Sequence, residues 1–203
     1  SSTPVVTSIL SPVGEYFIPI DEVSPTNISY FYDAANATVW TAYDSSGVIY
    51  AKKVNPQTLS HIDIVLDAAH TGGPLLRILT DGTYVYTVTA GNPVRIRKYD
   101  FSGNLQGSFS MAATTTDVTI GSGFIWFTNG LNITKLTTSD MSTNTTFTRA
   151  GSTTNYASVL YDNGHFYAAS GNAVDEFYVG TDLLVASYGG SYLGDHMDGS
   201  YFT

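Results

Sequence analysis

Acidic residues recur near the starts of predicted strands, and two carboxyl groups held close together are what glycosidic cleavage requires. One carboxyl group acts as the acid, and a second acts as the base or as the nucleophile. The candidates for these roles are Asp21, Glu22, Asp67, Asp117 and Asp195. They form no acid–base motif that recurs along the chain, and solvent-facing turn carboxylates account for them equally well. Glycoside hydrolysis is therefore an alternative here and not the main prediction.

Histidines and neighbouring carboxylates are the other candidates for a metal site. The histidines are His61, His70, His165 and His196. Only His70 and His196 lie near predicted strand entrances, where they could meet, and no spacing matches a zinc motif. Asp195 and Asp198 lack the alternating oxygen ligands of a calcium loop. We expect no cofactor, with Ca2+ bound in an acidic turn as the alternative.

Other catalytic and cofactor motifs are missing from the sequence. There is no Gly-x-Ser-x-Gly nucleophile turn, no Gly-x-Gly-x-x-Gly run and no phosphate-binding loop. The chain has no cysteine, which excludes disulfides and thiolate metal sites. On a strand, the basic residues Arg95 and Arg97 share one face and Lys98 points to the other. We expect this basic cluster on an exposed outer strand, and we expect the protein not to be an enzyme.

Four Asn-x-Ser/Thr sequons make asparagine side chains candidate sites of N-glycosylation. They begin at Asn27, Asn36, Asn132 and Asn144. This number is scarcely above what chance gives in a chain with so many hydroxyl residues. Asn27, Asn36 and Asn144 nevertheless fall in or beside predicted turns, where a glycan can be accommodated. All four therefore remain candidates.

The charge balance and the lengths of the apolar runs exclude two classes of partner. The 203 residues carry 8 basic and 17 acidic side chains, which gives a formal net charge of −9. Nucleic-acid binding needs a basic face that displaces counterions, and this chain cannot supply one. No apolar run approaches the length of a membrane-spanning helix. We therefore expect no nucleic acid as a partner and no insertion into a membrane.

A low charge content with many hydroxyl and aromatic residues is typical of secreted and cell-surface proteins. Only 12% of the residues are charged, whereas Ser and Thr together number 48 and Tyr alone numbers 15. These residue types favour strands and turns, and helix-forming Glu, Lys, Gln and Arg are scarce. We expect an extracellular or cell-surface location. The start at Ser1 without Met indicates a processed or excised product.

One pattern of a turn followed by a strand recurs along the whole chain. A turn rich in Asp, Asn or Gly precedes a strand that carries an aromatic residue at a fixed place. The aligned aromatic residues are Trp40, Tyr86, Trp126, Tyr167 and Phe202. Their spacings are 46, 40, 41 and 35 residues, close to the repeat length of propeller blades. We expect these rings to be structural residues buried between blades.

Each repeat contains four predicted strands, which predicts an all-β fold: a single five-bladed β-propeller of four-stranded antiparallel blades. Val5–Leu10 and Glu15–Ile20 are the third and fourth strands of one blade, while Gly194–Met197 and Ser200–Thr203 are its first and second strands. The last blade is thus shared by the N- and C-terminal strands. The blades of the single domain, 1–203, span about 21–66, 67–110, 111–150, 151–189, and 190–203 plus 1–20. A β-sandwich and a fragment of a larger propeller are the alternatives.

Two of these repeats resemble known propeller repeats. The run Phe124–Asn129 followed by Asn132–Leu136 resembles the Tyr-Val-Thr-Asn (YVTN) repeat of microbial surface propellers. Tyr84–Thr89 with Arg95–Phe101 and Gly103–Leu105 is similar to the NHL type of repeat. The Trp-Asp dipeptide of WD repeats and the double glycine of kelch repeats are missing. The resemblance implies a propeller fold, which hosts many functions.

The sequence predicts a non-catalytic structural or adhesive module, a subunit or repeat of a cell-surface filament or tandem array. Its expected partners are further copies of itself and surface glycans. A lectin-like propeller is the first alternative, because tachylectin-type propellers bind one sugar per blade. A lectin should repeat the same polar and aromatic residues in every blade, whereas the loops between blades differ here in length and residue type. A five-bladed glycoside hydrolase is the second alternative.

Overall fold

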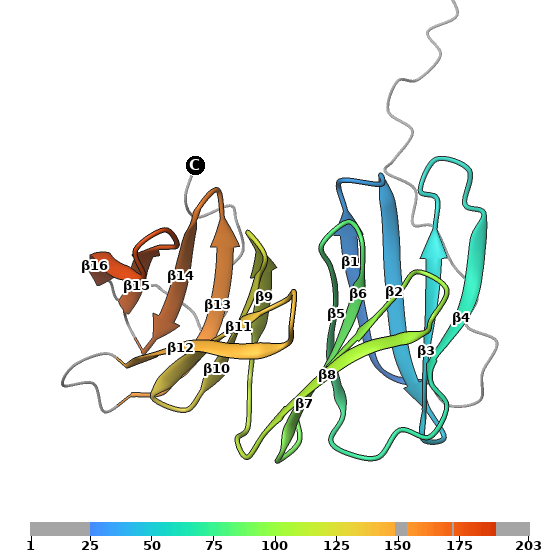
Figure 1. The fold of residues 1–203 in the computed structure, drawn as a ribbon, viewed down its shortest axis with the longest axis horizontal. Coiled ribbons are helices and arrows are strands. Elements are labelled where there is room, and N and C mark those ends of the chain that lie inside the picture. The colour runs from blue at the N-terminus through green and yellow to red at the C-terminus, as the bar shows by residue number, and fades with distance from the viewer. Residues whose placement is uncertain (1–24, 149–153, 172, 190–203) are drawn as a thin grey trace, which may run out of the picture.

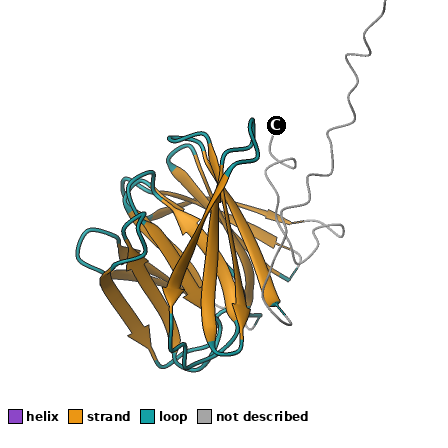
Figure 2. Ribbon diagram, turned by 90° about the vertical axis from the view of Figure 1, so that its right-hand side faces the viewer, coloured by secondary structure: helices purple, strands orange, loops and turns teal. Residues whose placement is uncertain are grey.

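The computed structural model describes residues 25–148, 154–171 and 173–189. These residues form sixteen β-strands in four separate antiparallel sheets (Figure 1). The described segments contain strands, turns and loops but no helix (Figure 2). No helix of the length and hydrophobicity that crossing a membrane requires therefore occurs in these ranges.

The first two sheets come from the N-terminal half of the described chain. The first contains β1 (Thr26–Asp33), β2 (Thr38–Ser45), β3 (Val48–Val54) and β4 (His61–Asp67). The second contains β5 (Leu75–Thr80), β6 (Val85–Thr89), β7 (Val94–Tyr99) and β8 (Leu105–Met111). In both sheets the strands are ordered as they are in the chain, so each sheet is a simple meander.

The other two sheets repeat this topology. The third contains β9 (Val118–Gly121), β10 (Phe124–Asn129), β11 (Asn132–Thr137) and β12 (Ser142–Thr148). The fourth contains β13 (Tyr156–Asp162), β14 (His165–Ser170), β15 (Ala173–Tyr178) and β16 (Leu183–Gly189). We call the four sheets blades 1 to 4. The predicted all-β architecture of repeated four-stranded antiparallel blades is confirmed.

The first strands of the blades lie next to one another. β1 contacts β5, β5 contacts β9, and β9 contacts β13. The first strand is therefore the inner strand of each blade and the fourth strand is the outer one. In Figure 1, β4 and β16 accordingly lie at opposite outer sides of the molecule. Blade 5, predicted from 190–203 and 1–20, falls outside the described residues, so the structure describes four blades.

The hydrophobic core of the described residues consists of three layers at the seams between neighbouring blades and a small cluster within blade 4 around Ala169 and Val174. Trp40 and Ile64 of blade 1 pack with Ile78 and Val85 of blade 2 in the first layer. The second layer joins blades 2 and 3, and the third joins blades 3 and 4. Blades 1 to 3 thus each bury one sheet face against the next blade along the chain, as radial repetition of small sheets requires.

The turn between β7 and β8 shows how closely two blades approach. Gly103 in this turn has φ +90°, a conformation that strains other residues. A Cβ atom at this position would lie 2.7 Å from Ile64 Cγ2 and 3.0 Å from the Val65 carbonyl oxygen. The turn between the third and fourth strands of blade 2 therefore rests on the fourth strand of blade 1.

Candidate functional site

Asp117, one of the predicted acid–base candidates, is a structural carboxylate at the inner edge of blade 3. It directly precedes β9 and its side chain is buried. Ser158 Oγ donates to Asp117 Oδ2 at 2.5 Å, and the Val159 backbone N–H donates to the same oxygen at 3.1 Å. Arg77 Nη2 lies 3.3 Å from the other oxygen. Asp117 therefore links the inner strands of blades 2, 3 and 4.

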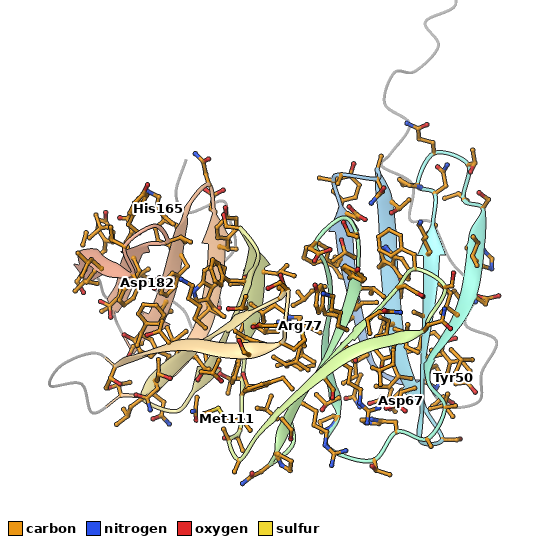
Figure 3. All side chains as sticks on the ribbon, in the orientation of Figure 1. Tyr50, Asp67, Arg77, Met111, His165 and Asp182 are labelled. Atoms are coloured by element: carbon orange, nitrogen blue, oxygen red, sulfur yellow. The ribbon has the colours of Figure 1, made fainter. Side chains whose placement is uncertain are left out.

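A similar hydrogen bond joins the inner strands of blades 1 and 2. Ser29 Oγ on β1 accepts a hydrogen bond from the Ile78 backbone N–H on β5 at 3.1 Å. Ser29 and Arg77, with Ile28 and Tyr30, also line a hollow of about 370 Å³. Arg77 lies in the middle of the molecule between the blades (Figure 3). Among the described residues that line the hollow, Arg77 alone is charged, and its charge is compensated by Asp117.

Asp67, a second predicted carboxylate, clamps the loop between blades 1 and 2. Arg97 on β7 donates to Asp67 Oδ2, and His70 Nδ1 lies 3.5 Å from the same oxygen. His70 Nε2 lies 3.0 Å from the Gly73 carbonyl oxygen. Asp67 thus belongs to the seam between blades 1 and 2, whereas Asp117 belongs to the later seams. The structure does not bring these two carboxylates together, and Asp21, Glu22 and Asp195 lie outside the described residues.

The histidines also lie apart from one another. His61 begins β4, His70 lies in the loop after β4, and His165 begins β14. Within the described ranges there is no group of three or more His, Asp or Glu side chains that could hold a metal ion. His196 falls outside these ranges. The expectation of no cofactor, with Ca2+ as the alternative, stays a prediction.

The basic cluster lies in two inter-blade seams, so its predicted place on an exposed outer strand is wrong. Arg95, Arg97 and Lys98 lie on β7, the third strand of blade 2. Arg97 contacts Asp67 on the side of blade 1, whereas Lys98 Nζ donates to the Thr138 carbonyl oxygen of blade 3 at 2.8 Å. The predicted alternation of faces is correct, but neighbouring blades contact both faces.

The sequon asparagines differ in what their amide nitrogen atoms contact. Asn36 Nδ2 donates to Asp33 Oδ2 at 2.8 Å and to the Gly82 carbonyl oxygen at 2.9 Å, so it bridges blades 1 and 2. Asn27 is exposed and donates to Asp44 Oδ2 at 3.0 Å. The other two sequons place Asn132 at the start of β11 and Asn144 on β12. Glycosylation of any of the four stays a prediction.

The aligned aromatic residues occupy equivalent places on the second strands. Trp40, Tyr86 and Trp126 are fully buried. Trp126 stacks on Tyr161 of blade 4, with ring centroids 5.5 Å apart and planes 7° apart. Each of these rings packs towards the following blade. Tyr167 of blade 4 is only partly buried, and Phe202 lies outside the described residues.

The residue opposite each aligned aromatic, on the third strand, is a feature that the sequence reasoning missed. The cross-strand pairs are Trp40 with Lys53, Tyr86 with Lys98, Trp126 with Lys135, and Tyr167 with Glu176. We call this the third-strand position. Three blades place a lysine there and blade 4 places a glutamate. The hairpin register, read from each aromatic, is the signal that could have found it.

Glu176 is the centre of a polar and aromatic cluster on blade 4. Tyr188 Oη donates to Glu176 Oε2 at 2.6 Å, and Tyr167 Oη donates to Oε1 at 3.4 Å. His165 Nδ1 lies 2.8 Å from Oε1, and its ring meets that of Tyr178 edge-on. We call His165, Tyr167, Glu176, Tyr178 and Tyr188 the blade 4 outer face. It lies on the side of the sheet opposite Phe166 and Phe177, which pack in the seam with blade 3.

Comparison with known proteins supports the fold. No family model matches the sequence, and no curated protein matches it. The WD40 domain of Neurospora crassa Pan2 matches with a TM-score of 0.58 and 12% identity, over 81% of this chain and 49% of that chain. The computationally designed Ika8 protein matches with a TM-score of 0.57 and 12% identity, over 78% of this chain and 48% of that chain. The chain spans about half the length of each. At such identities the likeness establishes a β-propeller-like fold and nothing about activity.

Proposed function

We propose that this chain is a non-catalytic structural or adhesive propeller module that works outside the cell, as a subunit or repeat of a surface filament or tandem array. The observation that carries this proposal is the apolar surface on the two terminal blades of the described chain. Tyr30 and Tyr32 of β1 are 78% and 56% exposed, and Leu183 of β16 is 66% exposed. Large exposed apolar patches mark interaction sites.

The proposal includes a fifth blade, formed by the N- and C-terminal segments. Residues 1–24 and 190–203 number 24 and 14, together 38, which is close to one repeat of 40 or 41 residues. A fifth blade from these residues would lie between blade 4 and blade 1 and would cover part of their apolar surface. The remaining surface then serves contacts between modules. We further assign the repeats to the YVTN and NHL kind, on the residues of β6, β7, β10 and β11.

The carboxylates within the described residues support a role without catalysis. Both oxygens of Asp117 are engaged by neighbouring strands, and Asp67 is engaged by Arg97 and His70. A general acid or base needs a carboxyl group that faces substrate. These two instead hold blades together.

Electron microscopy and sedimentation velocity of the purified chain test the assembly. We expect fibres or tandem arrays whose fraction rises with protein concentration. Single particles at every concentration would contradict the proposal.

Incubation with a panel of polysaccharides tests for catalysis. We expect no turnover. Asp117→Asn is the informative variant, and Ser158→Ala is its control because it removes the same hydrogen bond but keeps the carboxylate. Turnover that persists in Ser158→Ala and is lost in Asp117→Asn would identify an enzyme.

A lectin is the second candidate, favoured by the blade 4 outer face. Tyr178 and Tyr188 are 45% and 48% exposed beside the Glu176 carboxylate. Sugars stack on exposed rings and donate hydroxyl hydrogen bonds to carboxylates. Glycan-array binding that is lost in Tyr188→Ala and kept in Ile62→Ala, an exposed side chain on blade 1, would favour this candidate.

A further inference from the structure

The third-strand lysines of blades 1 to 3 make equivalent contacts with the next blade. Each reaches the turn between the third and fourth strands of the next blade. Lys53 Nζ lies 4.5 Å from the ring centroid of Phe101, which begins that turn in blade 2. Lys98 Nζ donates to the Thr138 carbonyl oxygen, at the same turn of blade 3.

Lys135 makes an ion pair across the next seam. Its Nζ lies 2.7 Å from Asp182 Oδ1, in the corresponding turn of blade 4. The Lys135 side chain is 3% exposed, so its charge depends on this partner. Three successive seams therefore share one rule: a cation on one blade meets a ring, a carbonyl oxygen or a carboxylate on the next blade.

Glu176 reverses the charge at this position in blade 4. Its carboxylate oxygens can only accept hydrogen bonds. A turn that docks here must therefore offer donors, where the three earlier turns offer acceptors or a ring. The turn of another copy that carries Asp182 would be repelled, because two carboxylates would meet.

We propose that residues 11–14 of this same chain dock against Glu176 on the blade 4 outer face, as the turn between the third and fourth strands of blade 5. This inference rests on the five-bladed ring of the proposed function. The sequence there is Ser11-Pro12-Val13-Gly14. It offers a hydroxyl group and backbone N–H groups as donors to a carboxylate, and it lacks the kinds of side chain that Lys53 and Lys135 contact, an aromatic ring and a carboxylate.

The chemistry of the segments outside the described residues agrees with this assignment. Residues 1–24 contain no Lys, no Arg and no His, so no basic side chain of that segment is available to form a salt bridge with Glu176. A carboxylate that accepts backbone N–H and hydroxyl hydrogen bonds makes the charge-assisted kind, which is shorter and stronger than a neutral one. Glu176 is therefore a residue that selects which turn can close this seam.

Engineered disulfides test the docking, because the chain contains no cysteine of its own. The test pair is Val13→Cys with Glu176→Cys. The matched positive control is Lys135→Cys with Asp182→Cys, at a contact that the structure describes. Both proteins are oxidised mildly, and the products are separated on non-reducing denaturing gels and identified by mass spectrometry.

We expect the test pair to form an intrachain disulfide to the same extent as the control pair, at every protein concentration. A disulfide between two chains would overturn the inference by identifying a second copy as the occupant. No disulfide in the test pair, with a normal control, would overturn it by placing the turn elsewhere. Neither result depends on whether filaments form, so failure here is distinct from failure of the proposed assembly.

A charge substitution tests the selection by Glu176 with cysteine-free protein. Glu176→Lys should speed proteolytic cleavage within residues 1–24 by about tenfold, the factor expected when one charge-assisted hydrogen bond is lost. Glu176→Gln keeps an acceptor oxygen and should change the rate less. Equal cleavage rates in Glu176→Lys and the unmodified chain would overturn the role of the carboxylate.

Discussion

At the scale of single residues, Trp126 shows what one aromatic side chain contributes to a seam. Its ring is fully buried and stacks on both Tyr161 and Phe166 of the next blade. Trp126→Ala would leave a large cavity between blades 3 and 4. We expect the free energy of unfolding to fall by about 3–5 kcal/mol.

Denaturant titration measures this loss, and Ile62→Ala is the control because that side chain is 63% exposed on the outer strand of blade 1. A loss below about 1 kcal/mol for Trp126→Ala would mean that the ring does not join the blades.

The buried Tyr86 phenol makes the folded protein less stable at alkaline pH. Burial, together with the hydrogen bond of its hydroxyl to Asp81, raises the pKa of the Tyr86 phenol well above its usual value. The unfolded chain releases this proton near pH 10, while the folded chain keeps it. The contribution of the protonated Tyr86 hydroxyl to the free energy of unfolding is therefore fully present below about pH 10 and is lost as pH rises further.

We expect Tyr86→Phe to lose less stability than the unmodified chain between about pH 8 and about pH 11. Urea midpoints at the two pH values provide the measurement, and Tyr30→Phe is the control because that side chain is exposed. Identical alkaline losses in Tyr86→Phe and the unmodified chain would contradict the assignment.

At the scale of elements, Thr128 holds the loop that leads into blade 3. Its Oγ1 accepts hydrogen bonds from the Thr116 and Asp117 backbone N–H groups, at 2.9 and 3.1 Å. Thr128 is 1% exposed. Thr128→Val keeps the shape but leaves these donors without an acceptor, so we expect a cost of about 1–3 kcal/mol or more.

Thr128→Ser keeps the hydroxyl group and serves as the control in the same unfolding measurement. Equal stabilities of the valine and serine variants would show that the hydroxyl group does not anchor the loop.

The strands themselves were predictable from the sequence, because local patterns determine them. The aromatic residues aligned from the repeat, Trp40, Tyr86 and Trp126, lie on the second strands β2, β6 and β10. The seams were not predictable in the same way. Lys53 and Lys98 stand 13 and 12 residues after their aromatic partners, whereas Lys135 stands 9 after Trp126. Because the hairpin turns differ in length, the third-strand position cannot be aligned between blades until the strand register is known.

The candidate site was less predictable than the fold. Asp67 and Asp117 were singled out as carboxylates near the starts of strands; Asp117 directly precedes β9, whereas Asp67 is the last residue of the outer strand β4. Their partners Arg97, Ser158 and Arg77 come from other blades, about 30 to 41 residues away in the chain. No local pattern specifies such contacts, so sequence alone could not separate structural carboxylates from catalytic ones.

At the scale of the whole molecule, the proposed fifth blade would make the stability of the fold depend on the terminal segments. We expect deletion of residues 1–20 to lower the Tm by about 10 °C or more, since each kcal/mol corresponds to about 2–4 °C in a domain of this size. Calorimetry provides the measurement, and binding of a hydrophobic dye should rise if the proposed blade 5 covers blade 4. An unchanged Tm would mean that blades 1 to 4 are stable without these residues.

The order of contacts between blades has a mechanical consequence. β1 meets β5, β5 meets β9, and β9 meets β13, so the seams follow the chain. Structures whose units contact their neighbours in sequence can lose one unit while the rest stay folded. Under tension applied at both ends, the blades should therefore detach one after another, and each should release about 130 Å of extended chain for its roughly 40 residues. A filament of such modules would therefore lengthen in steps under tension. Each step dissipates energy at a force that would rupture an inextensible connection.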